Sequence, residues 1–383
     1  MLYSTGADVS EKDGFPHFML KEIFEQPQAL KDAVVSRVSL AEAEIRIANE
    51  IRISSEELRA LRRINIVASG TSRHAGMAGQ YMFQDLLHLF ADVDYASEYE
   101  YRNPPIGPEE VTIVITQSGE TSDTLAAQRL ARRKGSRTIA VTNVMKSTVA
   151  KEADGVLYTH AGPEISIAST KAFTAQMAVL FLLSTYLGQV RGSLSREALR
   201  GWIEELLALP EKADTVLRCA DQCRRLADQF RGFEDFLFLG RAVHFPIAMD
   251  GALKLKEVSY VHAEGYPAGE TKHGPNALID ENLPVVIIAT CDQNDPGSVT
   301  RYKKSVSDVL GFKKQSARVI ALATEGDTEI SEIADHTIFI PRAPELLAPI
   351  LEIIPLQLFA YHVATRKGLD VDRPRNLVKS VQE

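Results

Sequence analysis

The sequence predicts an α/β protein of two related lobes, each built on a parallel sheet with helices on both faces. Short, apolar, β-rich runs alternate with helical runs, and strands are expected at 64–69, 92–99, 111–117, 137–143 and 155–161. The alternation begins again after residue 230, with further strands expected at 233–241, 284–291, 316–324 and 336–341. Apolar strands separated by helices are typical of parallel sheets that are covered on both faces.

Helical periodicity accounts for most of the remaining sequence. Helices are expected at 17–34 (interrupted by Pro27), from there to about residue 62, and at 76–90, 124–135, 170–188, 245–264 and 345–368. The charged helical stretch 195–230 is expected to connect the lobes, and residues 1–15 to form a flexible leader.

Composition indicates a soluble protein of two domains, with 383 residues, of which 45% are hydrophobic and 25% charged. The polar start and the interrupted apolar stretches argue against a signal peptide and a membrane span, so we expect a cytoplasmic protein. The net charge of −8 and the lack of a Lys/Arg stripe argue against nucleic-acid binding. Cys219, Cys223 and Cys291 are expected to be reduced thiols, and neither a metal nor a cofactor is expected.

The two halves form a weak internal repeat whose copies differ where the strands end. Hydroxyl-bearing residues follow the first two strands of the first lobe, at 70–72 and 116–121. Gly-Arg-Ala (240–242) and Thr-Cys-Asp (290–292) stand at the matching places in the second lobe. Only the first lobe is therefore expected to hold a phosphate.

The loop after the strand 111–117 is expected to bind an anion. Thr116, Gln117, Ser118 and Thr121 supply donors, and Gly119 permits close approach of the backbone. The helix that follows offers unpaired N–H groups at the positive end of its dipole, at the sheet edge where ligands bind. The alternative is a simple helix cap by Ser118 or Thr121, although a cap requires only one hydroxyl.

A further hydroxyl-rich segment, residues 164–174, leads into the buried helix expected at 170–188. It contains Ser166, Ser169 and Thr170. Lys171 in this segment is interpreted as either a phosphate-binding cation or, with slight preference, a solvated residue of the first helical turn.

The second lobe carries side chains suited to proton transfer. Lys254 and Glu257 lie three residues apart on one face of an otherwise apolar helix, so they form either a partly buried pair or a surface pair of little energetic weight. His273 follows in a loop rich in Gly and Pro, where an exposed imidazole can carry protons near neutral pH.

The C-terminal tail lacks a regular period and contains one lysine among apolar residues. It is either a frayed terminus or a segment docked on the body through Leu377, Val378 and Val381. Docking would bring the amine of Lys379 into a pocket, where a lysine of this kind can form a Schiff base with a ketose carbonyl.

Six segments together resemble a known family. In order they are SGTS (69–72), TQSGETSDT (116–124), EISIASTKAFT (164–174), GALKLKEVSYVHAE (251–264), AGETKHGP (268–275) and DVDRPRNLVKSV (370–381). They closely resemble the sugar-phosphate half of the glutamine–fructose-6-phosphate aminotransferases, the glucosamine-6-phosphate synthase family. HFMLKEIFEQP (17–27) resembles the segment that begins this half. The half consists of two sugar-isomerase (SIS) domains, and each is expected to be a flavodoxin-like parallel sheet flanked by helices.

The resemblance implies a role for each candidate residue. Glu257 carries a proton between C1 and C2 of the sugar, Lys254 assists proton movement at the hydroxyl end, and Lys379 forms the Schiff base. His273 comes from the neighbouring subunit of a homodimer and opens the sugar ring. The residues expected to bind the hexose 6-phosphate are Gly70, Thr71, Ser72, Thr116, Gln117, Ser118, Thr121, Ile167, Ser169 and Val378.

The implied domain division has five parts. They are a leader and N-terminal helical segment (1–45), a first SIS domain that binds the sugar phosphate (46–194), a helical connector (195–230), a second SIS domain with the catalytic Glu and His (231–368) and a tail with the catalytic Lys (369–383).

The implied activity is the isomerisation of fructose 6-phosphate and, with ammonia or a separate ammonia donor, the formation of glucosamine 6-phosphate. No segment resembles the family's glutaminase domain, and residue 2 is Leu where that domain begins with Cys, so we expect no glutaminase activity here. An amino-sugar-phosphate deaminase on the same fold is the alternative. A non-catalytic sugar-phosphate sensor is less favoured, because Glu257, His273 and Lys379 are all present.

Overall fold

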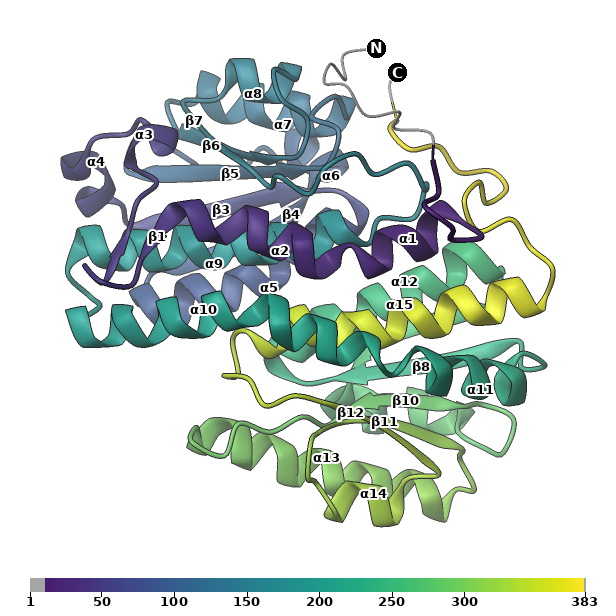
Figure 1. Ribbon diagram of the computed structural model, residues 1–383. Helices are drawn as coiled ribbons and strands as arrows, with labels where there is room; N and C mark the ends of the chain where they lie inside the picture. The colour runs from purple at the N-terminus through teal and green to yellow at the C-terminus, as the bar shows by residue number, and fades with distance from the viewer. Residues whose placement is uncertain (1–10, 382–383) are drawn as a thin grey trace.

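The protein contains two α/β lobes, one above the other in Figure 1, in a computed structural model that describes residues 11–381. Each lobe has a fully parallel sheet. The strands of the first lobe are β3 (Arg63–Ala68), β4 (Phe90–Tyr95), β5 (Glu110–Thr116), β6 (Arg137–Thr142) and β7 (Gly155–Tyr158). The strands of the second lobe are β8 (Asp235–Gly240), β9 (His262–Pro267), β10 (Val285–Ile288), β11 (Val319–Thr324) and β12 (His336–Ile340). The predicted fold class is confirmed.

The two sheets follow the same path, which confirms the internal repeat. Their spatial orders are β4-β3-β5-β6-β7 and β9-β8-β10-β11-β12, which is the flavodoxin-like order in each case. Buried aliphatic residues form these strands, and all residues of β10 and all but the first of β3 and β5 are buried. The strand order reverses between β3 and β5, the position where sheets of this kind bind ligands.

The helices of the first lobe largely follow the predicted pattern. They are α5 (Gly70–Leu87), α6 (Ala96–Arg102), α7 (Ser122–Arg133), α8 (Thr148–Glu152) and α9 (Lys171–Arg191). The strand expected at 92–99 ends at Tyr95, because the next seven residues form α6.

The N-terminal segment departs from the prediction beyond residue 34. α1 (Phe18–Phe24) and α2 (Gln26–Val34) are separated near Pro27, as expected, but the helix expected to continue to about residue 62 is wrong. A 3₁₀ turn (Val35–Arg37), the strand pair β1 (Val38–Ser39) and β2 (Glu44–Ile45), and the short helices α3 (Ala48–Ile51) and α4 (Ser55–Ala60) stand there. Tertiary bonding overrides the local pattern, because the Gln189 side chain of α9 bonds the N–H and the carbonyl of Ile45 at 2.8 and 3.2 Å.

The second lobe contains one strand, β9, and two helices, α13 (Pro296–Lys314) and α14 (Glu329–Ile333), that the sequence analysis does not predict. The helix expected at 245–264 ends at Ser259 as α12 (Phe245–Ser259), and the chain then forms β9. Gly265 and Pro267 favour a loop by composition. Gly265 is nevertheless required in this strand, since a Cβ there would lie 2.3 Å from Cα of Met249 on α12.

The other helices of this lobe begin at recognisable signals. The unpredicted α13 (Pro296–Lys314) is capped by Asp295, whose side chain accepts from Gly297 N at 2.9 Å. α14 (Glu329–Ile333) and α15 (Ala348–Arg366) follow, and short 3₁₀ segments lie at η2 (Ala242–His244), η3 (Ala268–His273) and η4 (Pro275–Leu278).

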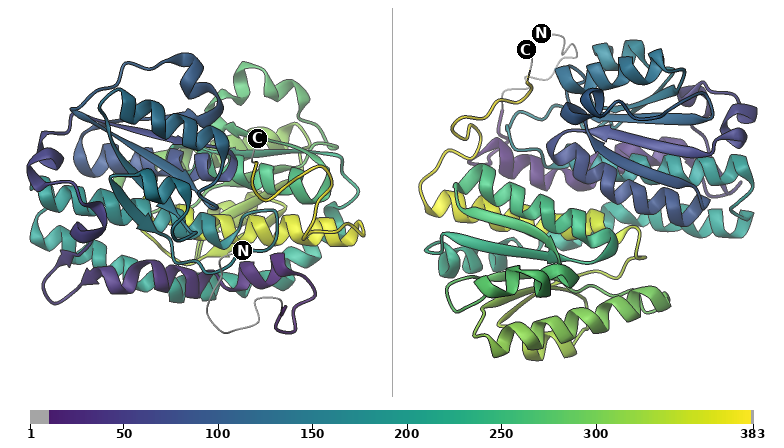
Figure 2. Two further views of the ribbon diagram at one scale, coloured as in Figure 1. Left: turned by 90° about the horizontal axis from the view of Figure 1, so that it is seen from above. Right: turned by 180° about the vertical axis from the view of Figure 1, so that it is seen from behind.

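A layer of helices fills the space between the two sheets (Figures 1 and 2). It includes α5, α9, α12 and α15, together with α10 (Arg196–Leu217), which continues into α11 (Ala220–Phe230) as the predicted connector. The largest apolar cluster runs through this layer from the first sheet to the second, so the lobes share one core. α9 and α15 have the length and apolarity of membrane spans, but 89% of each apolar window is buried inside the fold.

The C-terminal tail is docked on the first lobe, so the frayed-terminus alternative is wrong for residues up to 381 (Figure 1). The Asp372 carboxylate accepts from Phe18 N and Met19 N at 3.0 and 2.8 Å. The backbone carbonyl of Asp372 accepts from Ile167 N at 3.1 Å. The predicted apolar anchors are wrong, since Leu377, Val378 and Val381 stay 39–65% exposed. The polar contacts of Asp372 and the fully buried Val371 therefore hold the tail, rather than the three residues that were predicted. Residues 1–10 of the expected leader lie outside the described part of the chain.

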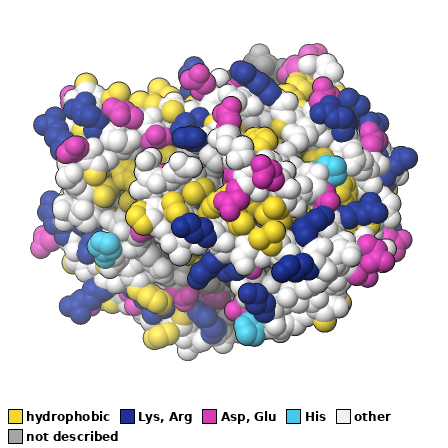
Figure 3. Space-filling model, turned by 90° about the horizontal axis from the view of Figure 1, so that it is seen from below, with side chains coloured by type: hydrophobic (Ala, Val, Ile, Leu, Met, Phe, Trp, Pro, Cys, Tyr) yellow, Lys and Arg dark blue, Asp and Glu magenta, His cyan; other side chains and the backbone are white. Residues whose placement is uncertain are grey.

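The outer face of the second lobe mixes Lys and Arg with Asp and Glu around scattered apolar side chains (Figure 3).

Candidate functional site

The carboxyl ends of β3 and β5 present two loops side by side at the point where the strand order reverses. Gly119 turns the second loop with φ +70°, and a Cβ there would lie 2.1 Å from Ser147 Oγ. Glycine is therefore required at this position for both its backbone angle and its size.

Side-chain capping is not the purpose of the hydroxyls in these loops. Among the described residues, no side chain caps the first turn of α5 or of α7. Thr121 occupies the N-cap position of α7, but its hydroxyl lies 3.3 Å from that of Thr116. Ser122 N lies 3.4 Å from the tail carbonyl of Val381. Apart from Ser122 N, the first turns of these helices are therefore open to a ligand, which favours the anion-binding interpretation over the cap.

One cavity of about 290 Å³ collects most of the predicted site residues. The predicted residues that line it are Gly70, Thr71, Ser72, Thr116, Gln117, Ser118, Thr121, Ile167, Ser169, Glu257, Val378 and Lys379. The lining also includes Ser69, Thr124 and Ser380, which the sequence analysis did not name although they stand in the same motifs. Residues from the first sheet, from α12 of the second lobe and from the tail thus meet at one place.

Lys379 enters this cavity with its amine held by two oxygens. Its Nζ lies 2.7 Å from Glu164 Oε2 and 2.6 Å from the Ser166 carbonyl. Next to it, Ser380 Oγ lies 3.1 Å from Ser118 Oγ of the anion loop. The tail therefore links the amine directly to the edge of the first sheet.

Glu164 is a buried carboxylate that the sequence analysis missed. It accepts from Thr170 N at 2.9 Å and Ala172 N at 3.1 Å, at the start of α9. Burial alone would raise its pKa, but the Lys379 ammonium and these N–H groups lower the pKa of Glu164 below its usual value. An acidic residue just ahead of a buried helix is the sequence signal that could have identified it.

Lys254 and Glu257 form a buried pair rather than a surface pair. Lys254 Nζ lies 2.5 Å from Glu257 Oε2, and the Lys254 side chain is fully buried while that of Glu257 is 21% exposed. Burial alone would lower the pKa of Lys254, but the carboxylates of Glu257 and Asp250 raise it above its usual value. A protonated amine therefore stands directly behind the carboxylate that faces the cavity.

Two candidate residues lie elsewhere. His273 ends the 3₁₀ segment η3, is exposed and does not line the cavity of its own chain. Lys171 is neither solvated nor a cavity residue. It is 3% exposed and its Nζ lies 2.6 Å from Glu25 Oε2, so both interpretations of this residue are wrong.

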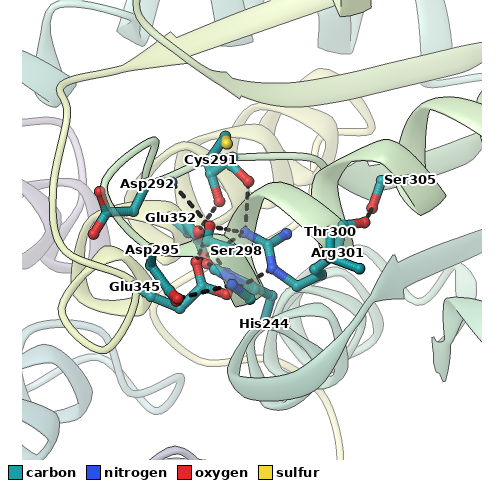
Figure 4. Close-up of polar contacts among 12 residues, drawn as sticks. His244, Cys291, Asp292, Asp295, Ser298, Thr300, Arg301, Ser305, Glu345 and Glu352 are labelled. Atoms are coloured by element: carbon teal, nitrogen blue, oxygen red, sulfur yellow. Dashed lines mark hydrogen bonds and ion pairs between the residues drawn. The ribbon is translucent and has the colours of Figure 1, made fainter.

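In the second lobe, protein side chains fill the corresponding place (Figure 4). Glu345, just before α15, accepts from His244 Nε2 at 2.9 Å, Ser298 Oγ at 2.6 Å and Arg301 Nε at 2.6 Å. His244 Nδ1 also donates to Glu352 at 2.8 Å. His244 follows β8, Ser298 and Arg301 follow β10, and Glu345 precedes α15, in the same order as the site segments of the first lobe. An internal carboxylate thus receives the donors that would hold an anion, which supports the expectation that only the first lobe binds a phosphate.

A larger cavity of about 790 Å³ lies beside this network. Its charged lining includes Asp292, Glu325, Asp327 and Glu329 against Lys303 and Arg342. The excess of carboxylates disfavours an anionic ligand, so size does not identify the sugar-phosphate site.

The comparisons with known proteins agree with this geometry. The family model described as SIS domain matches residues 57–186 and 234–367. The fold and the site therefore define a protein with two SIS domains.

Two similar proteins narrow the family. Glutamine–fructose-6-phosphate aminotransferase [isomerizing] from Chlorobaculum tepidum is 48% identical over 371 residues, which are 97% of this chain and 59% of that protein. The solved C-terminal domain of glucosamine-fructose-6-phosphate aminotransferase from Francisella tularensis has a TM-score of 0.88 at 34% identity, covering 95% of this chain and 100% of that one. The chain belongs to the glutamine–fructose-6-phosphate aminotransferase family and corresponds to its isomerase half.

A third comparison shows the fold alone. Glucosamine-6-phosphate deaminase from Thermotoga maritima has a TM-score of 0.69 at 22% identity, and the match covers 95% of this chain and 99% of that one.

The present chain spans 59% of the length of the Chlorobaculum relative.

The buried network of the second lobe predicts a pH-dependent stability. Burial alone would lower the pKa of His244, but the carboxylates of Glu352 and Glu345 raise it. The free energy that a raised histidine pKa adds to the fold is fully present below about pH 6.5, the pKa of an unfolded histidine. This contribution is lost as the pH rises through the pKa of His244 in the folded protein. His244→Gln should therefore lower the free energy of unfolding by roughly 3–5 kcal/mol at pH 6 and by clearly less at pH 9.

Urea unfolding at both pH values measures this difference. His262→Gln is the control, because His262 pairs with Asp235 at 2.8 Å on the surface and should change stability by less than about 1 kcal/mol. A loss for His244→Gln at pH 6 that is no larger than the loss for His262→Gln would contradict the charged network.

Proposed function

We propose that this chain isomerises fructose 6-phosphate and, supplied with ammonia, forms glucosamine 6-phosphate. The observation that carries the proposal is one cavity lined by hydroxyl loops, by the Glu257 carboxylate and by the Lys379 amine. These are the groups that an aldose–ketose isomerisation with a lysine nucleophile requires.

The phosphate is proposed to bind at the carboxyl ends of β3 and β5. Ser118, Thr121 and Ser72 offer hydroxyls, and the first turns of α5 and α7 offer N–H groups and the positive ends of their dipoles. Anchoring the phosphate away from the reacting carbons supplies binding energy that orients C1 and C2.

Lys379 is proposed as the nucleophile. Its neutral amine attacks the C2 carbonyl carbon of the open ketose, the carbonyl oxygen leaves as water, and a C2 imine remains. Glu164 and the Ser166 carbonyl hold the amine before the attack, at 2.7 and 2.6 Å. When ammonia takes the place of the lysine nitrogen at C2, the amine of Lys379 is released again.

Glu257 is proposed to take the proton from C1 and return it at C2. The buried Lys254 ammonium donates a hydrogen bond to Glu257 Oε2 at 2.5 Å. We propose that it also assists proton movement at the sugar hydroxyl. The Glu257 carboxylate at the cavity wall thus acts as the base, and the Lys254 ammonium behind it acts as the donor.

Ring opening is proposed to use His273 from a second copy of the chain. His273 is exposed at the end of η3, outside the cavity of its own chain, and so is available to a neighbouring subunit. The proposal therefore includes a homodimer. We also propose that the enzyme is cytoplasmic and takes nitrogen from ammonia or a separate donor.

The deaminase alternative would use the same residues in the reverse direction. The 22% identity to the Thermotoga maritima deaminase carries the fold alone and does not favour this alternative. The sensor alternative would not require a buried Lys254–Glu257 pair at the cavity.

Lys379→Ala should abolish the covalent adduct that borohydride traps with fructose 6-phosphate, because the nucleophilic nitrogen is gone. Mass spectrometry of the intact protein measures the adduct, and turnover should fall by at least about a hundredfold. Lys367→Ala, at an exposed lysine that ends α15, should keep the adduct. An adduct of unchanged yield in Lys379→Ala would refute the assignment.

Glu257→Gln should lower turnover by about 10²- to 10⁴-fold while the dissociation constant for fructose 6-phosphate changes little, since the phosphate loops are intact. Exchange of the C1 proton with deuterated water, followed by NMR, measures the chemical step. Glu264→Gln, at an exposed carboxylate on β9, is the matched control and should exchange normally. Normal exchange by Glu257→Gln would exclude this residue as the base.

A further inference from the structure

We propose that Glu22 of α1 is a positioning residue that acts on Lys379 through the 164–166 segment and controls when its amine is free to react. This inference rests on the proposed Schiff-base chemistry. No comparison or motif assigns a role to Glu22, and Glu22 does not line the cavity.

The geometry links Glu22 to Lys379 through one short piece of backbone. Glu22 Oε1 accepts from Ile165 N at 2.5 Å and from Ser166 N at 3.1 Å. Ser166 in turn gives its carbonyl to Lys379 Nζ at 2.6 Å. The segment that holds the amine is therefore itself held by Glu22.

Glu22 is also part of a buried group of charges. It is 2% exposed, and among the described residues its second oxygen, Oε2, has no hydrogen-bond partner. A carboxylate with one bare oxygen in the interior is costly, so the protonated form is favoured. Burial and the negative charge of Glu164 raise the pKa of Glu22 to about 8, with the Lys379 ammonium opposing the shift.

The surrounding charges define what happens when Glu22 ionises. Glu164 and Lys379 face it from the 164–166 segment and the tail, and Lys21 is the cation beside it on α1. Lys21 is already bonded to Asp13 at 2.6 Å. A new negative charge on Glu22 therefore acts on both partners of the buried group: it repels the Glu164 carboxylate and attracts the Lys379 ammonium.

This arrangement opposes release of the amine at alkaline pH. Attack on the sugar requires neutral Lys379, whereas a second carboxylate near its ammonium favours the protonated form. Removing the charge of Glu22 should let the neutral amine form at lower pH. A residue that only supported the fold would change the amount of active protein and leave this pH dependence unchanged.

The test is the rate of borohydride trapping of fructose 6-phosphate by the full chain between pH 6 and 10. The trapping rate should rise with pH as the amine loses its proton. In Glu22→Gln this rising limb of the rate–pH curve should move to lower pH by about half a unit to one unit, which gives roughly 3- to 10-fold more adduct at a given pH on the limb. Glu25→Gln is the matched control. Glu25 follows on the same segment but pairs with Lys171 at 2.6 Å, so its limb should coincide with that of the unmodified chain.

Glu22→Asp provides a second variant if Glu22→Gln does not fold. It keeps a titratable carboxyl but withdraws it from the amides of residues 165 and 166, so the maximal rate should fall about 3- to 10-fold while the limb stays in place. An unshifted limb in Glu22→Gln, an equal shift in Glu25→Gln, or an unchanged maximal rate in Glu22→Asp would each overturn the role of Glu22. Absence of any adduct in the unmodified chain would instead refute the Schiff-base function itself.

Discussion

The packing of α12 against α5 is the contact on which the candidate site depends. His74 Nδ1 on α5 lies 3.0 Å from Asp250 Oδ1 on α12, and both side chains are buried between the lobes. Glu257 lies two turns after Asp250 on the same helix, and residues 70–72 form the first turn of α5, just before His74. One interlobe contact therefore fixes the distance between the proposed base and the proposed phosphate loops.

The two lobes show how one fold can be used in two ways. In the first lobe the strand ends carry hydroxyls and uncapped helix starts, and the cavity remains open. In the second lobe the donors of His244, Ser298 and Arg301 converge on the internal carboxylate of Glu345. A side chain that already receives these donors leaves no uncompensated positive site for a phosphate. The second lobe contributes α12 to the site of the first instead.

Much of the fold followed from the sequence because its strands are continuous apolar runs and its long helices are periodic. The failures have tertiary causes. β9 contains Gly265 and Pro267, which read as a loop until the close approach of α12 is known. The strand pair near Ile45 exists because Gln189, far along the chain, bonds its backbone.

Most of the predicted site residues line one cavity, whereas the buried residues that hold them were not predicted. Motif residues such as Ser118, Glu257 and Lys379 were identified because their types and positions suggest chemistry, and the structure brings them to one cavity. Glu22 was missed because only burial and proximity distinguish it from surface acids, and Glu164 because its one sequence signal, a position just ahead of a buried helix, is shared by many N-terminal acids. The docking of the tail through Asp372 was missed for the same reason, since an N-terminal partner for that carboxylate is not visible in sequence.

The most direct measurement is a crystal structure of the chain trapped with fructose 6-phosphate and borohydride. The account predicts a phosphate within hydrogen-bonding distance of Ser118 and Thr121, continuous density from C2 to Lys379 Nζ, and the Glu257 carboxylate beside C1 and C2. A phosphate bound beside Asp292 and Arg342 in the second lobe, or a sugar attached to any other lysine, would contradict it.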